Sequence, residues 1–217
     1  MKDFIDYSFN KQKGKPLSQE IAHYIMKKIF MGEFPQGSRL TENTIAEELD
    51  VSNIPVREAF FILENTKIIE RIPRKGVRVK SISEKVMEDY TQALTEIFNI
   101  GVNYSIGKWS DEKYQTLMNR FSIARKFLED KEIIDFAMQC DYTCRYIFEV
   151  ANNEAFLNFY TQITYITNAY SQVKWKKEEN LKNREDLLST AVNAIINEQY
   201  EEAKMSLRDL SLKTFFI

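Results

Sequence analysis

Glycine and proline are both scarce in this chain, with six and four copies among 217 residues. Turn-rich all-β folds use both residues at many tight turns, so their scarcity argues against such folds and favours long helices. No apolar run approaches the roughly 18 residues that a membrane-spanning helix requires. The first 15 residues also lack the continuous apolar segment of a secretory signal. We therefore expect a cytoplasmic protein without a membrane partner.

Histidine and cysteine are too few for most catalytic or metal sites. The single histidine is His23, so neither a histidine-based triad nor a three-histidine metal site has residues to use. The glycines are too widely spaced for a dinucleotide-binding loop or a P-loop. Cys140 and Cys144 lie four apart on an expected helix, where disulfide geometry is rarely met, so we expect reduced thiols. These absences argue against an enzyme.

The net charge of −2 is an average over two unlike parts of the chain. Residues 1–82 carry 14 lysines and arginines against 11 acidic residues, whereas residues 83–217 carry 16 against 21. A mildly basic front joined to an acidic rear fits a DNA-reading module with an acidic partner domain. The charge difference is small and indicates DNA binding only together with the motifs described below.

Three helices are predicted in the first third of the chain. The first begins at Ser18, carries isoleucines every four residues and ends near Gly32. Thr41 is a natural cap for a short second helix, and Ser52 is one for the third. The inward positions of the third helix follow at i, i+3, i+4 and i+7: Val56, Ala59, Phe60 and Leu63.

The periodicity changes after the third helix. Residues 68–72 and 77–81 are predicted as two short strands around the basic tip PRKG. The pattern is then helical to the end, with polar breaks that give roughly six helices and no repeat, which is typical of a bundle. The sequence thus predicts a mainly α protein with three parts: a flexible arm at 1–15, a winged helix-turn-helix at 16–82 and an all-α antiparallel bundle at 83–217.

The start of the third helix, VSNIPVREAF, has the features of a helix end that faces a polyanion. Ser52 is expected to satisfy a free backbone amide, and Pro55 is tolerated because first-turn amides have no helical partner. The remaining N–H groups and the helix dipole favour phosphate. Asn53 and Arg57, one turn apart, would project into the major groove, where asparagine suits adenine and arginine suits guanine.

Each of these features has an ordinary structural explanation when it is taken singly. Arg57 could form a surface ion pair with Glu58, and a charged hairpin tip is often only a solvated turn. The ordered succession of three helices and a basic hairpin is more specific. It predicts a recognition helix in the major groove, with Arg74 and Lys75 of the wing on phosphates or in the minor groove.

The same segments resemble the GntR family of bacterial regulators. VSNIPVREAF is similar to that family's recognition-helix signature, MGEFPQGSRLTENTIAEELDVS to the preceding elements and RIPRKGVRV to the wing. The helical remainder resembles the effector-binding domain of the family's fatty-acid-regulator branch, in its shorter six-helix form. The resemblance implies a homodimeric repressor that binds a palindromic double-stranded DNA operator and responds to a small-molecule effector. The candidate DNA-contacting residues are Arg39, Thr41, Asn43, Ser52, Asn53, Arg57, Arg74, Lys75 and Gly76.

Four positions depart from the family pattern, and one of them is Gln36, which stands where a proline is common. Asn43 and Asn53 stand where members often carry arginine, which favours A·T-rich half-sites over guanine reading. Lys67 replaces the usual helix-ending glycine, so we expect a left-handed backbone there at a modest energetic cost.

The resemblance also bears on metals and effectors. Many relatives hold a divalent metal through one aspartate and three histidines. Asp141 stands at the aspartate position, but Arg145, Leu188 and Leu210 stand at the histidine positions, so we expect neither that metal nor another cofactor. Asp141 and Arg145 could form an ion pair instead, and an arginine with leucine walls would suit an organic acid or acyl ligand. The candidate effector residues are Gln92, Glu96, Asp141, Arg145, Leu188 and Leu210.

Three functions are compatible with the sequence. The first is a DNA-binding regulator that senses an effector in its helical domain. The second is a regulator that binds DNA constitutively because the pocket is filled and the Asp–Arg pair is purely structural. The third is an all-α enzyme with an appended DNA-binding module, for which no catalytic residue pair stands out.

Overall fold

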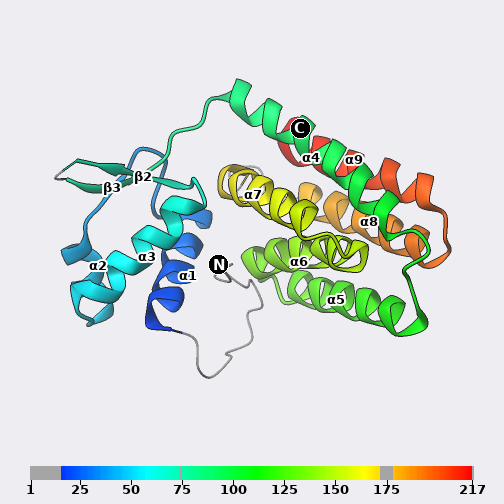
Figure 1. The fold of residues 1–217 in the computed structure, drawn as a ribbon, viewed down its shortest axis with the longest axis horizontal. Helices are drawn as coiled ribbons and strands as arrows, with labels where there is room; N and C mark the ends of the chain where they lie inside the picture. Colours follow the sequence, from blue (N-terminus) through cyan, green and yellow to red (C-terminus); the bar gives the residue numbers. More distant parts are fainter. Residues whose placement is uncertain (1–15, 74, 172–177, 217) are drawn as a thin grey trace. The chain divides into compact units, whose positions relative to one another are not determined.

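The protein is mainly helical, as the sequence predicts (Figure 1). The computed structural model describes residues 16–73, 75–171 and 178–216. The expected arm at residues 1–15 and the wing residue Arg74 lie outside the described residues.

The described chain divides into two compact units. The first comprises residues 16–83 together with 168–171, and the second comprises residues 84–167 together with 178–216. Each unit buries its own apolar side chains.

The first unit contains three helices and a small sheet. Its elements in chain order are α1 (Leu17–Phe30), β1 (Arg39–Leu40), α2 (Glu42–Leu49), α3 (Asn53–Asn65), β2 (Ile69–Ile72) and β3 (Gly76–Val79). The isoleucines that repeat along α1 are buried, as predicted. The four predicted inward residues of α3 are at most 1% exposed. These two helical faces form the core of the unit.

The sheet is antiparallel and its strands lie in the order β1-β3-β2. The β2–β3 hairpin is the predicted wing, with Ile72 opposite Gly76. The sequence does not predict β1, because a two-residue strand shows no alternation. A Cβ on Gly76 would lie 2.6 Å from the carbonyl oxygen of Leu40, and the φ of Gly76 is +87°. The close approach of β3 to the end of β1 therefore requires glycine.

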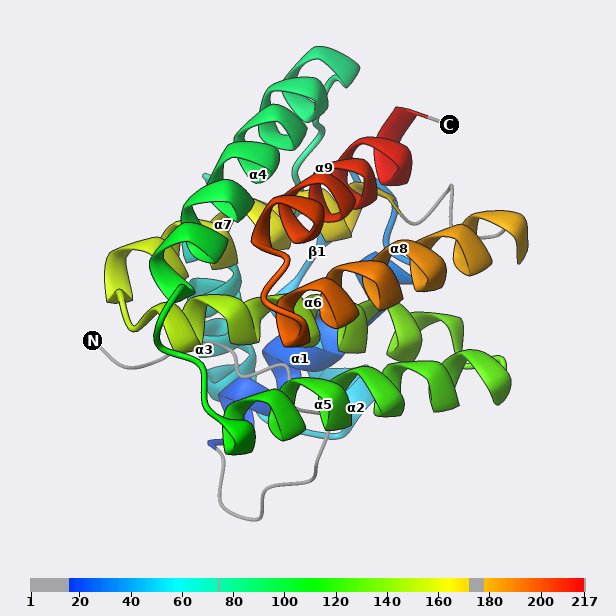
Figure 2. The same cartoon turned by 90° about the vertical axis from the view of Figure 1, so that its right-hand side faces the viewer.

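The second unit is built from helices that pack side by side. Its described helices in chain order are α4 (Glu84–Ser105), α5 (Asp111–Glu129), α6 (Ile133–Ala151), α7 (Glu154–Ser171), whose last turn groups with the first unit, α8 (Glu178–Ile196) and α9 (Tyr200–Phe216). Helix α9 packs against both α4 and α8, and α6 packs against α4 and α5 (Figure 2). None of the helices in the described ranges has both the length and the apolar character needed to cross a membrane.

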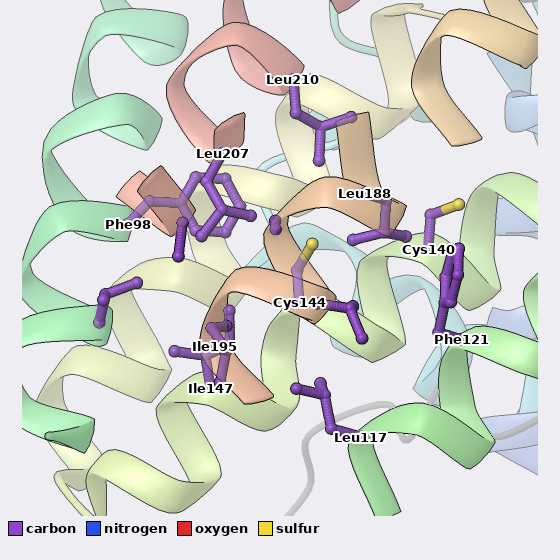
Figure 3. Packing of buried hydrophobic residues seen from close by; sticks show 14 of the residues in the cluster. Phe98, Leu117, Phe121, Cys140, Cys144, Ile147, Leu188, Ile195, Leu207 and Leu210 are labelled. Atoms are coloured by element: carbon purple, nitrogen blue, oxygen red, sulfur yellow. The ribbon is translucent and has the colours of Figure 1, made fainter. Parts of the chain in front are cut away.

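The core of the second unit is apolar and aromatic. Phe98 of α4, Phe121 of α5 and Leu207 of α9 converge on it from three sides (Figure 3). Cys140 and Cys144 are free and buried in the same core. Burial raises the pKa of Cys140 to about 11, so this thiol stays protonated and inert at neutral pH.

Candidate nucleic-acid interface

The first turn of α2 is fixed by its cap. Thr41 has extended backbone angles, and its Oγ1 accepts a hydrogen bond of 3.2 Å from the amide of Thr44, as predicted for an N-cap. Asp50 ends the helix in a left-handed conformation with φ of 52°, and two further residues lead into α3. The tight connection sets the start of α3 beside the start of α2.

Ser52 occupies the predicted N-cap position of α3, but its side chain makes no capping hydrogen bond. The expected role of Ser52 is therefore wrong in this detail. An N-cap oxygen accepts from the amide of the second or third helical residue, and Pro55 at the third position has no N–H, which leaves the amide of Ile54 as the one such donor. The exposed Ser52 hydroxyl is thus left to face outward at the start of the helix.

Asn53 and Arg57 are both exposed on α3, as the sequence predicts, and both are held by side chains of α2. The Nδ2 of Asn53 donates to the Oδ1 of Asn43 over 2.9 Å. The Nε of Arg57 lies 3.0 Å from each carboxylate oxygen of Glu42, and its Nη2 lies 2.7 Å from Oε2. The partner of Arg57 is therefore Glu42 on the neighbouring helix rather than the adjacent Glu58.

The Glu42–Arg57 contact shifts the pKa of each group away from neutral pH. Hydrogen bonds from Arg57 lower the pKa of Glu42, and the carboxylate raises the pKa of Arg57 in return. Both groups are consequently ionised at neutral pH. The Arg57 side chain remains 65% exposed, against 23% for Glu42, so the guanidinium still reaches solvent beyond its acidic partner.

The tip of the wing is tied to β1 by a hydrogen bond. The Nε of Arg39 donates to the carbonyl oxygen of Lys75 over 2.5 Å, which links β1 to the wing tip. Lys75 is exposed, whereas Arg78 is paired with Glu70. Of the two basic tip residues predicted to contact DNA, Lys75 is therefore placed as expected, and Arg74 lies outside the described residues.

Sequence reasoning missed two residues of this surface. Ile54, the second residue of α3, is 67% exposed next to Asn53. An exposed apolar side chain at this place can contact the methyl group of thymine. The signal was available, because Ile54 falls outside the inward i, i+3, i+4 stripe of the helix. Glu42 was missed because only the folded chain brings it to Arg57.

The candidate effector residues lie in different surroundings. Gln92 and Glu96 border a hollow of about 570 Å³ between α4 and α9, together with Arg208. Leu188 and Leu210 are 1% and 4% exposed and belong to the apolar core (Figure 3). Gln92 and Glu96 thus border a surface hollow, whereas Leu188 and Leu210 lie in the packed interior.

Asp141 and Arg145 also have partners other than each other. The hydroxyl of Tyr160 donates to Oδ1 of Asp141 over 2.8 Å, and the Nε of Arg145 lies 3.4 Å from Oε1 of Glu149. The expected ion pair is therefore replaced by one between Arg145 and Glu149, which lies one turn further along α6. Burial raises the pKa of Asp141, although Tyr160 and the positive charge of Arg145 act in the opposite direction. Within the described residues, no group of three or more His, Cys, Asp or Glu side chains is placed to hold a metal ion.

Three helices with an exposed third helix, followed by a hairpin, define a winged helix-turn-helix. Residues 17–79 match the family model described as "Bacterial regulatory proteins, gntR family". The N-terminal part of this chain is therefore similar to the DNA-binding domain of the GntR family.

Similar proteins extend this assignment. The HTH-type transcriptional regulator YdhC of Bacillus subtilis (strain 168) is 26% identical over 130 residues, which cover 58% of this chain and 58% of that protein. The gluconate operon transcriptional repressor of the same organism is 45% identical over 65 residues, covering 30% of this chain and 26% of that protein. The chain thus spans little more than half of the first relative and a quarter of the second. These relatives are transcriptional regulators, which supports the expectation that the chain is not an enzyme.

One solved structure shows the same fold along nearly the whole chain. The E. coli protein McbR/YncC superimposes with a TM-score of 0.78 at 14% sequence identity, covering 92% of this chain and 95% of that one. The likeness shows that the N-terminal winged module and the helical bundle occur together in one known architecture.

Proposed function

We propose that this protein is a transcription regulator that binds double-stranded DNA through the start of α3 and the wing. The observation that carries the proposal is the exposed start of α3, where Asn53, Ile54 and Arg57 face solvent together. This combination offers donors and acceptors for base edges and an apolar contact for a thymine methyl. The match to the GntR family and the named repressors among its relatives support the same function.

The electrostatics of the interface are modest, which shapes how it would bind. Arg57 is partly neutralised by Glu42, and the whole chain carries a net charge of −2. Backbone amides at the start of α3 and the exposed Lys75 supply the main attraction for phosphates. We therefore expect weak sequence-independent binding and a comparatively large share of affinity from base contacts.

The test is selection of preferred duplexes from a random pool by the full chain, followed by fluorescence anisotropy with the selected operator. Each good bidentate base contact contributes about 1–3 kcal/mol, so the double substitution Asn53→Ala with Arg57→Ala should weaken operator binding by about tenfold or more. Arg125→Ala, which removes an exposed arginine of the second unit, is the matched control and should bind as the wild type does. An absence of sequence selection, with the fold intact, would refute the function.

The regulator is proposed to act as a homodimer on an inverted repeat. A two-fold symmetric dimer presents two recognition helices to two half-sites, which is the usual reason for palindromic operators. Repression would follow from occupation of a promoter. Deletion of one half-site should then remove most of the affinity, whereas a monomer would lose only half of its binding sites.

The second unit is proposed to bind a small anionic effector, such as an organic acid or an acyl ligand, as the resemblance to the fatty-acid-regulator branch suggests. Its support is Arg145, whose side chain is 16% exposed. The Nε and Nη1 atoms of Arg145 are buried without a hydrogen-bond partner, and Nε lies 3.4 Å from Oε1 of Glu149, so an anionic ligand would take up the unpaired Nη1. Burial raises the pKa of Asp141, so this carboxyl opposes an incoming anion less than an exposed one would. No metal is needed in this arrangement.

A second candidate is a regulator that binds DNA without sensing a ligand. The observation in its favour is that Leu188, Leu210 and Asp141 are packed in the core. A thermal-shift screen with small carboxylates, acyl thioesters and sugar acids separates the two. A ligand at 100 times its Kd adds about 2.7 kcal/mol, which corresponds to roughly 5–10 °C for a chain of this size.

The control for that screen is again Arg125→Ala. A shift that survives in Arg125→Ala and disappears in Arg145→Ala supports the sensing model, and the same ligand must then change operator affinity, because the coupling between two sites is reciprocal. A flat screen favours the constitutive regulator, whereas a shift retained by Arg145→Ala places the ligand elsewhere and removes Arg145 as the anion-binding residue.

A further inference from the structure

The first turn of α2 contacts both side chains that would read bases. Glu42 and Asn43 are consecutive, and they hold Arg57 and Asn53 respectively. Neither Glu42 nor Asn43 needs to touch a base to do so. The cap at Thr41 fixes the turn from which both reach out.

We infer that Glu42 is a specificity-determining residue, which positions the Arg57 guanidinium so that its free edge faces a guanine. The inference rests on the proposed DNA-binding function and deepens it. The carboxylate accepts from Nε and Nη2 of Arg57, with distances of 3.0 Å and 2.7 Å to Oε2. Two bonds from one planar group to another prevent rotation about the end of the side chain.

The N–H donors of Arg57 that Glu42 leaves free are the ones that guanine requires. A guanidinium has five N–H donors: one on Nε and two on each Nη. Glu42 occupies the Nε side, which leaves both donors of Nη1 and the second donor of Nη2 along the outer edge. Two parallel donors match the O6 and N7 acceptors of guanine in the major groove. Since Arg57 is 65% exposed, this outer edge is accessible.

Asn43 acts on Asn53 in the same way. One N–H of the Asn53 amide is used by the Oδ1 of Asn43 over 2.9 Å. The second N–H and the carbonyl oxygen of Asn53 are left, and these are the donor and the acceptor that adenine N7 and N6 require. The first turn of α2 therefore presets both reading side chains before DNA arrives, which reduces the ordering lost on binding.

The negative charge of Glu42 affects sequence-independent binding and base selectivity in opposite ways. A carboxylate near a phosphate backbone weakens sequence-independent binding, whereas the same carboxylate strengthens the choice of guanine through Arg57. Removing it should therefore move non-specific affinity and base selectivity in opposite directions. A residue that only maintained the fold would move both in the same direction.

The experiment compares two substitutions at Glu42. Glu42→Gln removes the charge and keeps the length, and Glu42→Asp keeps the charge but is too short to reach both nitrogens of Arg57. Glu58→Gln, which removes an exposed acid of α3, is the matched control. The readouts are affinities for the selected operator, for a non-specific duplex, and for an operator changed at the guanine whose preference is lost in Arg57→Ala. Circular dichroism and the thermal midpoint verify that each variant is folded.

Both Glu42 variants should lower the ratio of operator to changed-operator affinity by about tenfold, within the range of a bidentate contact. Non-specific affinity should rise in Glu42→Gln and stay level in Glu42→Asp, and Glu58→Gln should leave the ratio unchanged. The inference is overturned if a folded Glu42 variant keeps the wild-type ratio, if Glu58→Gln lowers it equally, or if Arg57→Ala loses preference at no guanine. In each of those cases the wild type still selects an operator. If the wild type selects none, the proposed function itself fails, and the inference falls with it.

Discussion

Gly101 allows α4 to approach α6, and its replacement tests how the core of the second unit is packed. A Cβ at this position would lie 2.6 Å from Cε1 and 2.7 Å from Cζ of Phe148. Phe148 is fully buried and stacks on Tyr160 with ring centroids 4.4 Å apart. Phe98 lies on it at a centroid distance of 6.2 Å. The ring therefore has no free space into which it can withdraw.

Two opposing effects set the stability of Gly101→Ala. Alanine in a helix interior is favoured over glycine by about 1 kcal/mol. Overpacking a well-filled core costs about 1–3 kcal/mol, and contacts this short place Gly101→Ala in the upper part of that range. The net expectation is a loss of about 1–2 kcal/mol, which corresponds to a fall of roughly 2–8 °C in the thermal midpoint for a chain of this size.

The assay is urea unfolding followed by tryptophan fluorescence, because Trp109 packs against Tyr114 in the same unit. Asn103→Ala, an exposed position of the same helix, measures the gain from helix propensity without a packing change and should be slightly stabilising. Combining Gly101→Ala with Phe148→Leu should recover part of the loss, which a double-mutant cycle detects as coupling. If Gly101→Ala stabilises the protein as much as Asn103→Ala does, Phe148 yields without cost and the packing reasoning is wrong.

Three further predictions follow from single residues. Lys67 has a φ of 65°, so Lys67→Gly should stabilise the protein by about 0.5–1 kcal/mol in urea unfolding, and a gain of equal size in Lys67→Ala would contradict the backbone explanation. If Ile54 contacts a thymine methyl, replacing single thymines of the selected operator by deoxyuridine should weaken wild-type binding at one position and leave Ile54→Ala unaffected there; equal losses in both proteins would exclude the contact. Burial raises the pKa of Asp141 in the folded state, so the folded protein holds its proton more tightly and the unfolding free energy should fall as pH rises from about 4 through the folded-state pKa. Asp141→Asn should remove this fall, and parallel pH profiles for the two proteins would refute it.

The features that the sequence predicted well depend on residues close together in the chain. Thr41 caps α2 because its side chain meets an amide three residues away. Lys67 adopts the expected left-handed conformation because it occupies the place where a helix ends and the chain must turn. Ser52 shows the limit of this local reasoning. Its position was right, but its side chain makes no capping hydrogen bond, and Pro55 removes one of the two amides that such a bond uses.

The side-chain partners of the candidate effector residues could not be predicted from the sequence. The resemblance placed Asp141, Arg145, Leu188 and Leu210 around one position, but side-chain rotamers and helix packing decide which of them meet. Asp141 turns to Tyr160, which is 19 residues away, and Arg145 turns to Glu149. The leucines instead fill the space between helices, because apolar side chains gain free energy from burial wherever the fold offers it.

The sequence by itself determined the order of the helices, the wing hairpin and the exposed start of α3 with Asn53 and Arg57, since periodicity and capping are properties of neighbouring residues. The tertiary structure alone decided what those residues touch. Glu42 reaches Arg57 across 15 positions of the chain, and Asn43 reaches Asn53 across 10. The physical reason is that a charged or amide side chain takes whichever partner the packed helices bring within hydrogen-bond distance, and that distance is fixed only when α2 and α3 pack together.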